Sequence, residues 1–328
     1  MAPTFIHPTL NLPISVLLSR HPLTLVPIIP TTSPLRLNPG QTLIMAIFNA
    51  TPDSFSDGSL QNLNLESALE SIALMLSSPY RPDILDIGGM STRPGSTPCS
   101  EEEELERVIP LIRAIRKREA WDEVMISVDT YRPSVARAAL EVGANLINDV
   151  RGGREEGMME IIAEMEVPYV LMHSRGDSTT MTSPESQTYE SGIVDGVKRE
   201  LGESVVKALE KGVREWDIIL DPGIGFAKSP IQSIDLLKNL HQLQPLPLPS
   251  SRTSAEPSKY PVLVGASRKG FVGKVTGRTE PQERAWGDAV VNALCVAKGV
   301  EILRVHDWRG ARESVEMAKT LFGDKDIV

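Results

Sequence analysis

The stretch GVEILRVHDW, residues 299 to 308, ends an apolar run in an unusual set of side chains. The run VEIL predicts a buried strand, and Arg304, His306 and Asp307 follow it closely. Because side chains alternate between the two faces of a strand, Arg304 and His306 are expected on the same side. A guanidinium and an imidazole placed together form either a solvated strand end with an ion pair or a binding site for an anion. The rest of the sequence has to decide between these two interpretations.

Other apolar runs of the chain also break into polar residues. The predicted strands are residues 43–48, 83–87, 124–128, 145–147, 169–172, 218–220, 262–264 and 300–305. Helical patterns lie between and after them, near residues 65–77, 101–118, 133–142, 157–165, 190–212, 231–241, 283–298 and 309–321. Eight successive β-then-α units predict a single α/β domain, a closed (β/α)8 TIM barrel. An open, doubly wound sheet is the alternative, although its opening GxGxxG turn is absent from the sequence.

The polar strings fall where a barrel of this class carries its function. In chain order they read FNATPDSFSDGS, DIGGMSTRPGS, SVDTYRP, INDVRGG, LMHSRGD, LDPGIGFAKS, VGASRKGFVG and RVHDW. Each begins at the carboxyl end of a predicted strand, and these ends meet on one face of the barrel. The sequence therefore predicts one site built from all eight strand ends.

Each polar residue also has a plain structural explanation. Asparagine and aspartate cap turns and helices, glycine permits left-handed turns, lysine and arginine form solvated ion pairs, and a histidine can be a satisfied core residue. These explanations cover Asn49, Asp53, Arg93, Asp129, Asn148, His173, Asp221, Gly223, Gly225 and Lys269 one at a time. They do not explain why carboxylates, amides and cations recur at the same end of every strand.

The residue types divide into two groups with opposite chemistry. Arg93, Lys269, Arg304 and His306 are donors suited to phosphate oxygens, and Thr92 can add a neutral donor. Asn49 offers an oxygen to Mg²⁺, a hard cation that usually arrives with a polyphosphate. Asp129, Asn148 and Asp221 are mainly acceptors that can read the donor edge of a flat heterocycle. No Ser–His–Asp or Cys–His arrangement is evident, and Lys269 is the obvious candidate for a nucleophile.

Bulk properties exclude several classes of protein. The chain has 328 residues, is 41% hydrophobic and 23% charged, and carries a net charge of −9. That charge argues against wholesale nucleic-acid binding, although a locally basic cleft remains compatible with it. Cys99 and Cys295 lie far apart, which argues against a disulfide scaffold or a cysteine zinc site and favours a reducing compartment. No apolar run is long enough to span a bilayer. We expect a cytoplasmic protein, with a mitochondrial location as the alternative.

Two segments depart from the alternating pattern. Residues 1–40 are rich in proline, serine and threonine, and no acidic residue occurs before Asp53. This leader is either an inert, linker-like extension or an organelle transit segment, although its prolines argue against an amphipathic targeting helix. Residues 244–260 are of low complexity and predict a surface insertion on the face away from the site. The barrel domain is expected to span residues 41–328.

The polar strings, taken together and in this order, resemble those of dihydropteroate synthases. NATPDSFSDGS, DIGGMSTRPGS, SVDT, INDV, LDPGIGFAKS, ASRKG and RVHDW carry the resemblance, which extends from about residue 43 to residue 321. The variant MHSRG is more similar to the fungal branch of the family than to the bacterial one. In fungi this domain commonly follows two other folate-pathway domains, so the leader could be a remnant of a linker.

The resemblance implies a pterin-binding TIM barrel and a transferase of folate biosynthesis. That family condenses (7,8-dihydropterin-6-yl)methyl diphosphate with 4-aminobenzoate, using Mg²⁺, and releases diphosphate and 7,8-dihydropteroate.

Carried over by position, the pterin would contact Asp129, Asn148, Met172, Asp221 and Lys269. The diphosphate would contact Asn49, Thr92, Arg93, Arg304 and His306, with Mg²⁺ at Asn49. The 4-aminobenzoate would contact Thr92, Pro94, Phe226, Ser267 and Gly270. Catalysis would rest on Lys269, Arg304, His306 and Arg93. Residues 49–59 and 89–96 would be mobile loops, and the enzyme would be a homodimer.

Several positions depart from common forms of the family pattern. Ala50 replaces valine, Met90 replaces glutamate, and Asp288 stands where threonine is common. Gly270 stands where bacterial members often have serine, which leaves the aminobenzoate carboxylate to backbone N–H groups at a helix start. Three other functions stay open: a corrinoid-dependent folate methyltransferase, a Schiff-base aldolase using Lys269, and an inactive homologue. The first has no use for Arg93 and Lys269 together.

Overall fold

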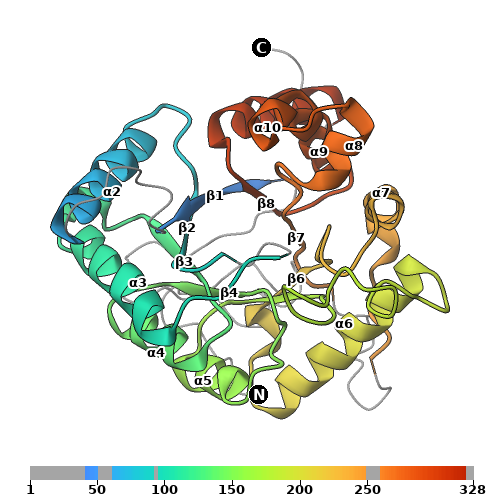
Figure 1. The fold of residues 1–328 in the computed structure, drawn as a ribbon, viewed down its shortest axis with the longest axis horizontal. Coiled ribbons are helices and arrows are strands. Elements are labelled where there is room, and N and C mark those ends of the chain that lie inside the picture. Colours follow the sequence, from blue (N-terminus) through green and yellow to red (C-terminus); the bar gives the residue numbers. More distant parts are fainter. Residues whose placement is uncertain (1–40, 51–60, 92–94, 249–258, 323–328) are drawn as a thin grey trace, which may run out of the picture.

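A ring of helices surrounds a barrel of parallel strands in the computed structural model (Figure 1). The structure describes residues 41–50, 61–91, 95–248 and 259–322. The predicted leader and most of the predicted insertion lie outside these residues, so both stay predictions. Among the described helices, none is long and apolar enough to cross a membrane.

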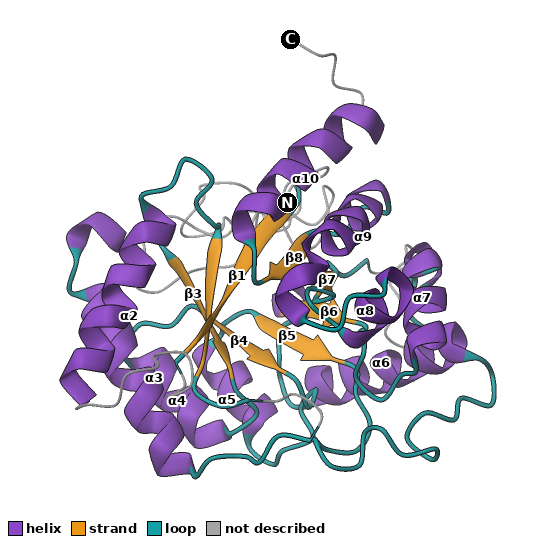
Figure 2. Cartoon of the chain, turned by 45° about the horizontal axis from the view of Figure 1, so that its top comes forward, coloured by secondary structure: helices purple, strands orange, loops and turns teal. Residues whose placement is uncertain are grey.

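The strands agree closely with the predicted runs and pair in parallel. Their order in the sheet is β6-β5-β4-β3-β2-β1-β8-β7. A bridge between Leu220 and Val262 joins β6 to β7, so the two edges of the sheet meet. The predicted TIM barrel is thus confirmed, and its strands occupy the centre of Figure 2. The strands are β1 (Leu43–Asn49), β2 (Ile84–Gly88), β3 (Met125–Asp129), β4 (Leu146–Asp149), β5 (Tyr169–Met172), β6 (Ile218–Asp221), β7 (Leu263–Val264) and β8 (Ile302–Val305).

The helices cover the outside of the barrel in chain order. They are α2 (Gln61–Leu76), α3 (Glu101–Arg116), α4 (Pro133–Glu141), α5 (Met158–Met165), α6 (Ile193–Glu210), α7 (Pro230–Lys238), α8 (Gly270–Thr276), α9 (Ala285–Ala297) and α10 (Trp308–Phe322). The helical patterns of the sequence do not include α8, which is only seven residues long. Its start at Gly270 was expected from the family resemblance alone.

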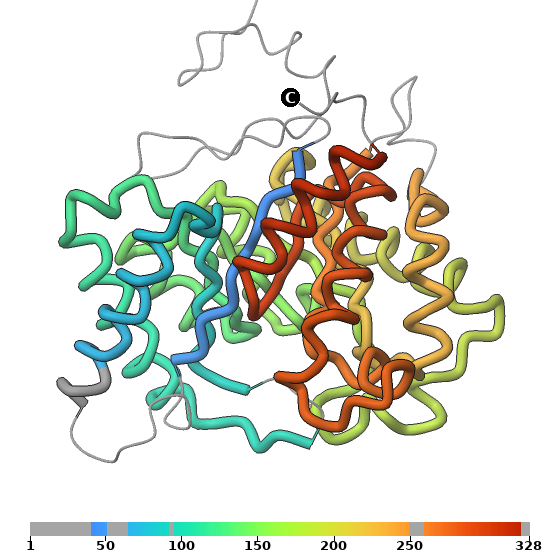
Figure 3. Tube along the Cα trace, turned by 90° about the horizontal axis from the view of Figure 1, so that it is seen from above, coloured from blue at the N-terminus to red at the C-terminus, as the bar shows by residue number. Residues whose placement is uncertain are grey.

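The barrel interior has an apolar lower layer and a polar upper layer. Inward side chains recur at every second residue of a strand. In the amino half they form a separate apolar cluster of Leu43, Met45, Ile84, Met125, Leu146, Val170, Ile219, Leu263 and Ile302. Two residues further along the strands, the buried inward positions carry Asp86, Ser127, Asn148 and Asp221. In Figure 3, β1 runs from top to bottom, so this polar layer faces the lower edge of the picture.

The described ends of the predicted insertion are joined to each other at the amino end of β7. The backbone N–H of Tyr260 donates to Oε1 of Gln244 at 2.7 Å, and Nε2 of Gln244 donates to the carbonyl of Tyr260 at 2.5 Å. One side-chain amide therefore takes the place of a neighbouring strand at this point. The described ends lie on the face away from the polar layer, as the sequence predicts.

Candidate active site

Arg304 lies between two carboxylates in the polar layer. Its Nε donates to Oδ2 of Asp86 at 2.6 Å, and its Nη2 donates to Oδ2 of Asp129 at 2.5 Å. Asn148 donates from Nδ2 to the same oxygen of Asp86 at 3.2 Å. Asp86 is fully buried and the Arg304 side chain is 19% exposed. Arg304 therefore neutralises carboxylates of the barrel, so the ion pair that the sequence offered as one interpretation exists, but it lies inside the barrel and not at a solvated strand end.

One guanidinium does not offset all the negative charge of this layer. Burial raises the pKa of Asp129 to about 7, against the opposing effect of Arg304, and Asp86 raises it further. Burial also raises the pKa of Asp221, while Lys269 and the N–H of Gly223 act in the opposite direction. Burial works against the charge of Arg304, but the carboxylates together raise its pKa above the ordinary value. The carboxylates of this layer therefore favour a ligand that donates hydrogen bonds to them.

The predicted pterin residues come together in this layer. Asp129 and Asn148 are direct neighbours in the register of β3 and β4, and Met172 and Asp221 are direct neighbours in that of β5 and β6. All four are buried. Asp221 accepts the backbone N–H of Gly223 with Oδ1 at 2.7 Å, which leaves its other oxygen for further donors.

Lys269 reaches the same place from the loop after β7. Its Nζ donates to the carbonyl of Ile224 and lies 4.3 Å from the ring centroid of Phe226. Burial lowers the pKa of Lys269 to about 8, and Asp221 opposes this effect. Gly225 leaves room for the lysine, because a Cβ there would lie 3.0 Å from Cδ of Lys269. Gly225 therefore provides space for the Lys269 side chain in addition to permitting a left-handed turn.

The remaining described site residues lie at the carboxyl ends of β1, β7 and β8. Nδ1 of His306 is 3.2 Å from Oγ of Ser267, and the backbone N–H of His306 donates to the same oxygen at 3.3 Å. Asn49 ends β1 opposite Gly88, and Gly270 opens α8. Thr92, Arg93 and Pro94, together with residues 51–60, lie outside the described residues, so their predicted roles stay predictions.

His173 is a satisfied buried histidine, one of the two alternatives that the sequence left open. Its Nε2 is 3.0 Å from Oε2 of Glu200, and its Nδ1 is 2.8 Å from Nζ of Lys228. Burial, with Lys228 nearby, lowers the pKa of His173 to about 4, so the ring is neutral. Because a carboxylate only accepts, Nε2 carries the proton and Nδ1 accepts from Lys228. Lys228 also donates to the carbonyl of Phe226 at 2.9 Å and so fixes the loop after β6.

Sequence reasoning missed Asp86 and Lys228 as parts of the site. For Asp86 a signal was present, since it lies two residues after the apolar inward residue Ile84 and must face the barrel interior. Lys228 lies within the quoted string LDPGIGFAKS, but nothing in that string shows that its side chain turns toward His173.

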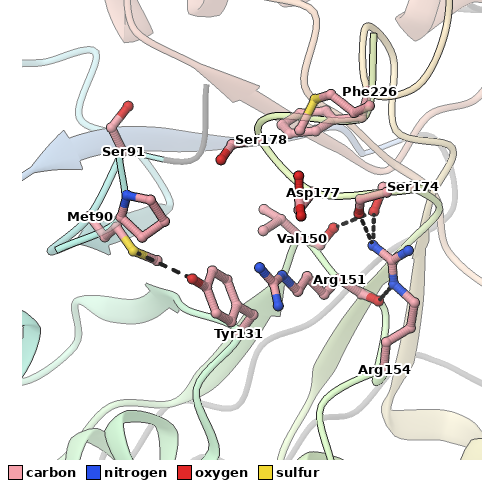
Figure 4. Close-up of a pocket in the computed structure, with 13 residues that line it drawn as sticks. Met90, Ser91, Tyr131, Val150, Arg151, Arg154, Ser174, Asp177, Ser178 and Phe226 are labelled. Atoms are coloured by element: carbon pink, nitrogen blue, oxygen red, sulfur yellow. Dashed lines mark hydrogen bonds between the residues drawn. The ribbon is translucent and has the colours of Figure 1, made fainter. Parts of the chain in front are cut away.

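A pocket opens beside Phe226, between the loops that follow β2 to β6 (Figure 4). Arg151 stacks at 3.8 Å over the ring of Tyr131, and Nη2 of Arg154 donates to Oγ of Ser174 at 2.8 Å. Of the predicted site residues that the structure describes, Phe226 alone lines this pocket. A second pocket is lined by Ser267, His306 and Asp288, on the side of α9 and α10.

Comparison with known proteins agrees with this geometry. The model of the family described as "Pterin binding enzyme" matches residues 45–306. The dihydropteroate synthase of Bacillus subtilis is 42% identical over 282 residues, which cover 86% of this chain and 88% of that protein. The chain belongs to the dihydropteroate synthase family.

Other members show how the family domain is used. The folic acid synthesis protein fol1 of Schizosaccharomyces pombe is 40% identical over 322 residues, or 98% of this chain, but the chain spans only 42% of that protein's length. Dihydropteroate synthase of Xanthomonas albilineans, solved with 4-aminobenzoic acid, superposes with a TM-score of 0.74 at 36% identity. The match covers 88% of this chain and 95% of the solved one. The dihydropteroate synthase barrel thus extends over nearly all described residues.

Asp129 should make the stability of this dihydropteroate synthase family member depend on pH. Its pKa is about 7 in the folded protein and ordinarily 3.8, so between these values the folded state holds a proton that the unfolded state releases. The stabilisation is fully present below about pH 4 and is lost as the pH rises through about 7. Urea unfolding across this range should show a steeper fall in the free energy of unfolding for wild type than for Asp129→Asn. Equal pH dependence in the two proteins would contradict the assignment, because the other buried carboxyls are common to both.

Proposed function

We propose that this chain condenses (7,8-dihydropterin-6-yl)methyl diphosphate with 4-aminobenzoate, releasing diphosphate and forming 7,8-dihydropteroate. The observation that carries the proposal is the meeting of two kinds of side chain at one end of the barrel. Asp129 and Asp221 supply acceptors, and Arg304 and Lys269 supply cations that interact with those carboxylates. The dihydropteroate synthases to which the chain is similar include one solved with 4-aminobenzoic acid.

In this proposal the pterin lies on the floor of the site, which is the part of the polar layer where Asp129, Asn148 and Asp221 accept hydrogen bonds. A pterin carries its amino group and a ring N–H on one edge, and a carboxylate can accept two such donors. Asp221 takes this edge, and Asp129 and Asn148 accept from other ring donors. Met172, 4% exposed, packs against the ring from β5, and Lys269 donates to it. Binding completes a layer that holds more carboxylate than cationic charge.

The diphosphate lies above this floor, at the ends of β1 and β8. Arg304 reaches toward it from the floor, and His306 lies two residues further along the same strand direction. Thr92 and Arg93 complete the set in the proposal. The partly buried His306 is well placed for an anion because its backbone and ring are both held by Ser267.

The aminobenzoate lies between Phe226 and the loop after β7. Phe226 offers its ring face, with the cation of Lys269 at 4.3 Å on one side. Ser267, the backbone at Gly270, Thr92 and Pro94 surround the rest of the ring and its carboxylate. The ring is thereby held with its amine toward the pterin methylene carbon.

Mg²⁺ fits this site only together with the diphosphate. The described residues contain no group of three or more His, Cys, Asp or Glu that could hold a metal ion. Mg²⁺ typically keeps several waters and binds through substrate phosphates, so a single protein oxygen suffices, and Asn49 would supply it. When bound, the ion would neutralise charge on the departing diphosphate.

The chain's own residues have a limited chemical task in the proposed reaction. The bond between the methylene carbon and the diphosphate oxygen breaks, and the electron-rich pterin stabilises the cation that remains. Arg304, Lys269 and His306 stabilise negative charge on the leaving group. The aniline nitrogen then forms the new bond to carbon and loses a proton, which needs no strong protein base. Positioning and electrostatics supply the rate enhancement.

The first test of the proposal is diphosphate release. Purified protein mixed with Mg²⁺, the pterin diphosphate and 4-aminobenzoate should release one diphosphate for each dihydropteroate formed. EDTA should stop the reaction, and added Mg²⁺ should restore it. Absence of both products from correctly folded protein would refute the proposed function.

Lys269→Met should lower kcat/KM for the pterin substrate by about a hundredfold, because it removes a preorganised cation but keeps the aliphatic chain. Lys274→Met is the matched control, since Lys274 is an exposed lysine in α8. It should behave like wild type in the same steady-state assay. Equal kinetics for the two variants would remove Lys269 from the site.

We also propose that the enzyme is a homodimer that buries the apolar face of α9 and α10. Trp286 and Val290, one turn apart on α9, are 87% and 71% exposed, and Met317 and Leu321, one turn apart on α10, are 60% and 61% exposed. The two helices pack side by side (Figure 1). Exposed apolar side chains gathered on adjacent helices are typical of a contact between subunits.

Analytical ultracentrifugation tests this proposal. Wild type should sediment as two chains and Trp286→Glu as one, because a buried charge opposes association. Ile231→Glu is the control, since Ile231 is 72% exposed on α7. A monomeric wild type, or dissociation by the α7 variant alone, would contradict the dimer face.

A further inference from the structure

Arg268 adopts a backbone conformation that side-chain-bearing residues rarely adopt. Its φ angle is +58°, in the left-handed region, although it is not a glycine. Such residues persist only when their surroundings hold them, and they gather at functional sites. Arg268 lies between Ser267, which the proposal places beside the aminobenzoate, and Lys269, which it places beside the pterin. The conformation of this one residue therefore sets the direction of two functional side chains.

The backbone of Arg268 is held at both of its polar groups. Its N–H donates to Oδ2 of Asp288 at 2.8 Å, and its carbonyl accepts from Nη1 of Arg284 at 2.6 Å. Arg284 and Asp288 are four residues apart, immediately before α9 and in its first turn. They therefore approach Arg268 from two consecutive elements, the 3-10 turn Pro281–Arg284 and α9.

Asp288 also holds the neighbouring side chain. The hydroxyl of Ser267 donates to the same Oδ2 at 3.1 Å, and Oγ of Ser267 is the atom that contacts His306. Asp288 is 9% exposed, and its Oδ1 has no hydrogen-bond partner among the described residues. A buried carboxylate that uses one oxygen for two bonds at this loop is costly if its purpose is stability alone.

On the far side of Arg268 the chain turns Lys269 into the barrel. Nζ of Lys269 reaches the carbonyl of Ile224 and the ring of Phe226. An extended or right-handed residue at position 268 would point Lys269 elsewhere, because φ at 268 sets the direction of everything that follows. The left-handed turn thus lets the two neighbours of Arg268 serve the aminobenzoate side and the pterin side of the proposed site.

We propose that Asp288 and Arg284 are positioning residues that clamp Arg268 in the left-handed conformation and so aim Ser267 and Lys269 into the active site. This inference rests on the proposed function. The clamp does not touch substrate, and its effect passes through the backbone of residues 267–269. It gives a physical role to Asp288, the residue that departs from the family pattern near the start of α9.

The test exploits the fact that glycine reaches positive φ without strain. Asp288→Ala should lower kcat/KM for both substrates by about tenfold to a hundredfold, the scale expected for misplaced groups. Asp288→Asn, which keeps one acceptor oxygen, should lose less. Adding Arg268→Gly to Asp288→Ala should restore most of the activity, because the turn no longer needs the clamp. Adding Arg268→Ala, the matched control, removes the same side chain but keeps the strain and should restore nothing.

The outcomes separate the clamp from the proposed function. Wild type that releases no diphosphate would overturn the proposed function, whereas active wild type with unchanged Asp288→Ala would overturn the clamp alone. Equal rescue by Arg268→Gly and Arg268→Ala would also overturn it, because the backbone conformation would then be irrelevant. If Asp288→Ala does not fold, the same two additions to Asp288→Asn make the comparison. Circular dichroism and calorimetric binding of the pterin diphosphate accompany each variant.

Discussion

The structure depends on how the barrel neutralises the carboxylates that fill its upper layer. Asp86 and Asp129 are buried, and Arg304 is the cation that bonds to both of them. Buried charges are tolerated only when they are paired and hydrogen-bonded. Because Arg304 serves two carboxylates and Lys269 acts on Asp221, three carboxylates share two cations and the layer keeps an excess of acceptors. In the proposed reaction the ring N–H groups of the pterin would supply donors to these acceptors, which would favour a pterin over a ring without such donors.

The surrounding loops keep this layer in place through a second set of buried contacts. Lys228 joins the loop after β6 to His173 at the end of β5, and His173 passes the connection to Glu200 on α6. Arg175 binds Glu200 and lies 3.9 Å from the ring centroid of Tyr189, whose hydroxyl donates to the carbonyl of Ala227. The contacts form a closed circuit around the loop that presents Phe226. The loop that carries Phe226 is therefore tied to the end of β5 and to α6.

The sequence predicted the barrel well because its signals are local. Apolar runs such as residues 169–172 coincide with a strand, and the polar string after each strand begins at the carboxyl end of that strand. The sequence predicted which residues belong to the candidate site, but not which of them form hydrogen bonds with each other. Arg304 and Asp86 are 218 positions apart, and their bond follows from the register of β8, β1 and β2, which no local pattern reveals. The left-handed turn at Arg268 could not be predicted for a local reason, because an arginine does not indicate a positive φ angle. Helix α8 is too short to show a period.

The amide pairing of Gln244 with Tyr260 closes the base of the chain segment between these two residues. Both bonds are made across the base of that segment, so its length does not enter the geometry of β7. A peptide inserted between Gln244 and Tyr260 should therefore leave β7 and its contacts in place. The barrel thus offers an attachment point at the end opposite its chemistry.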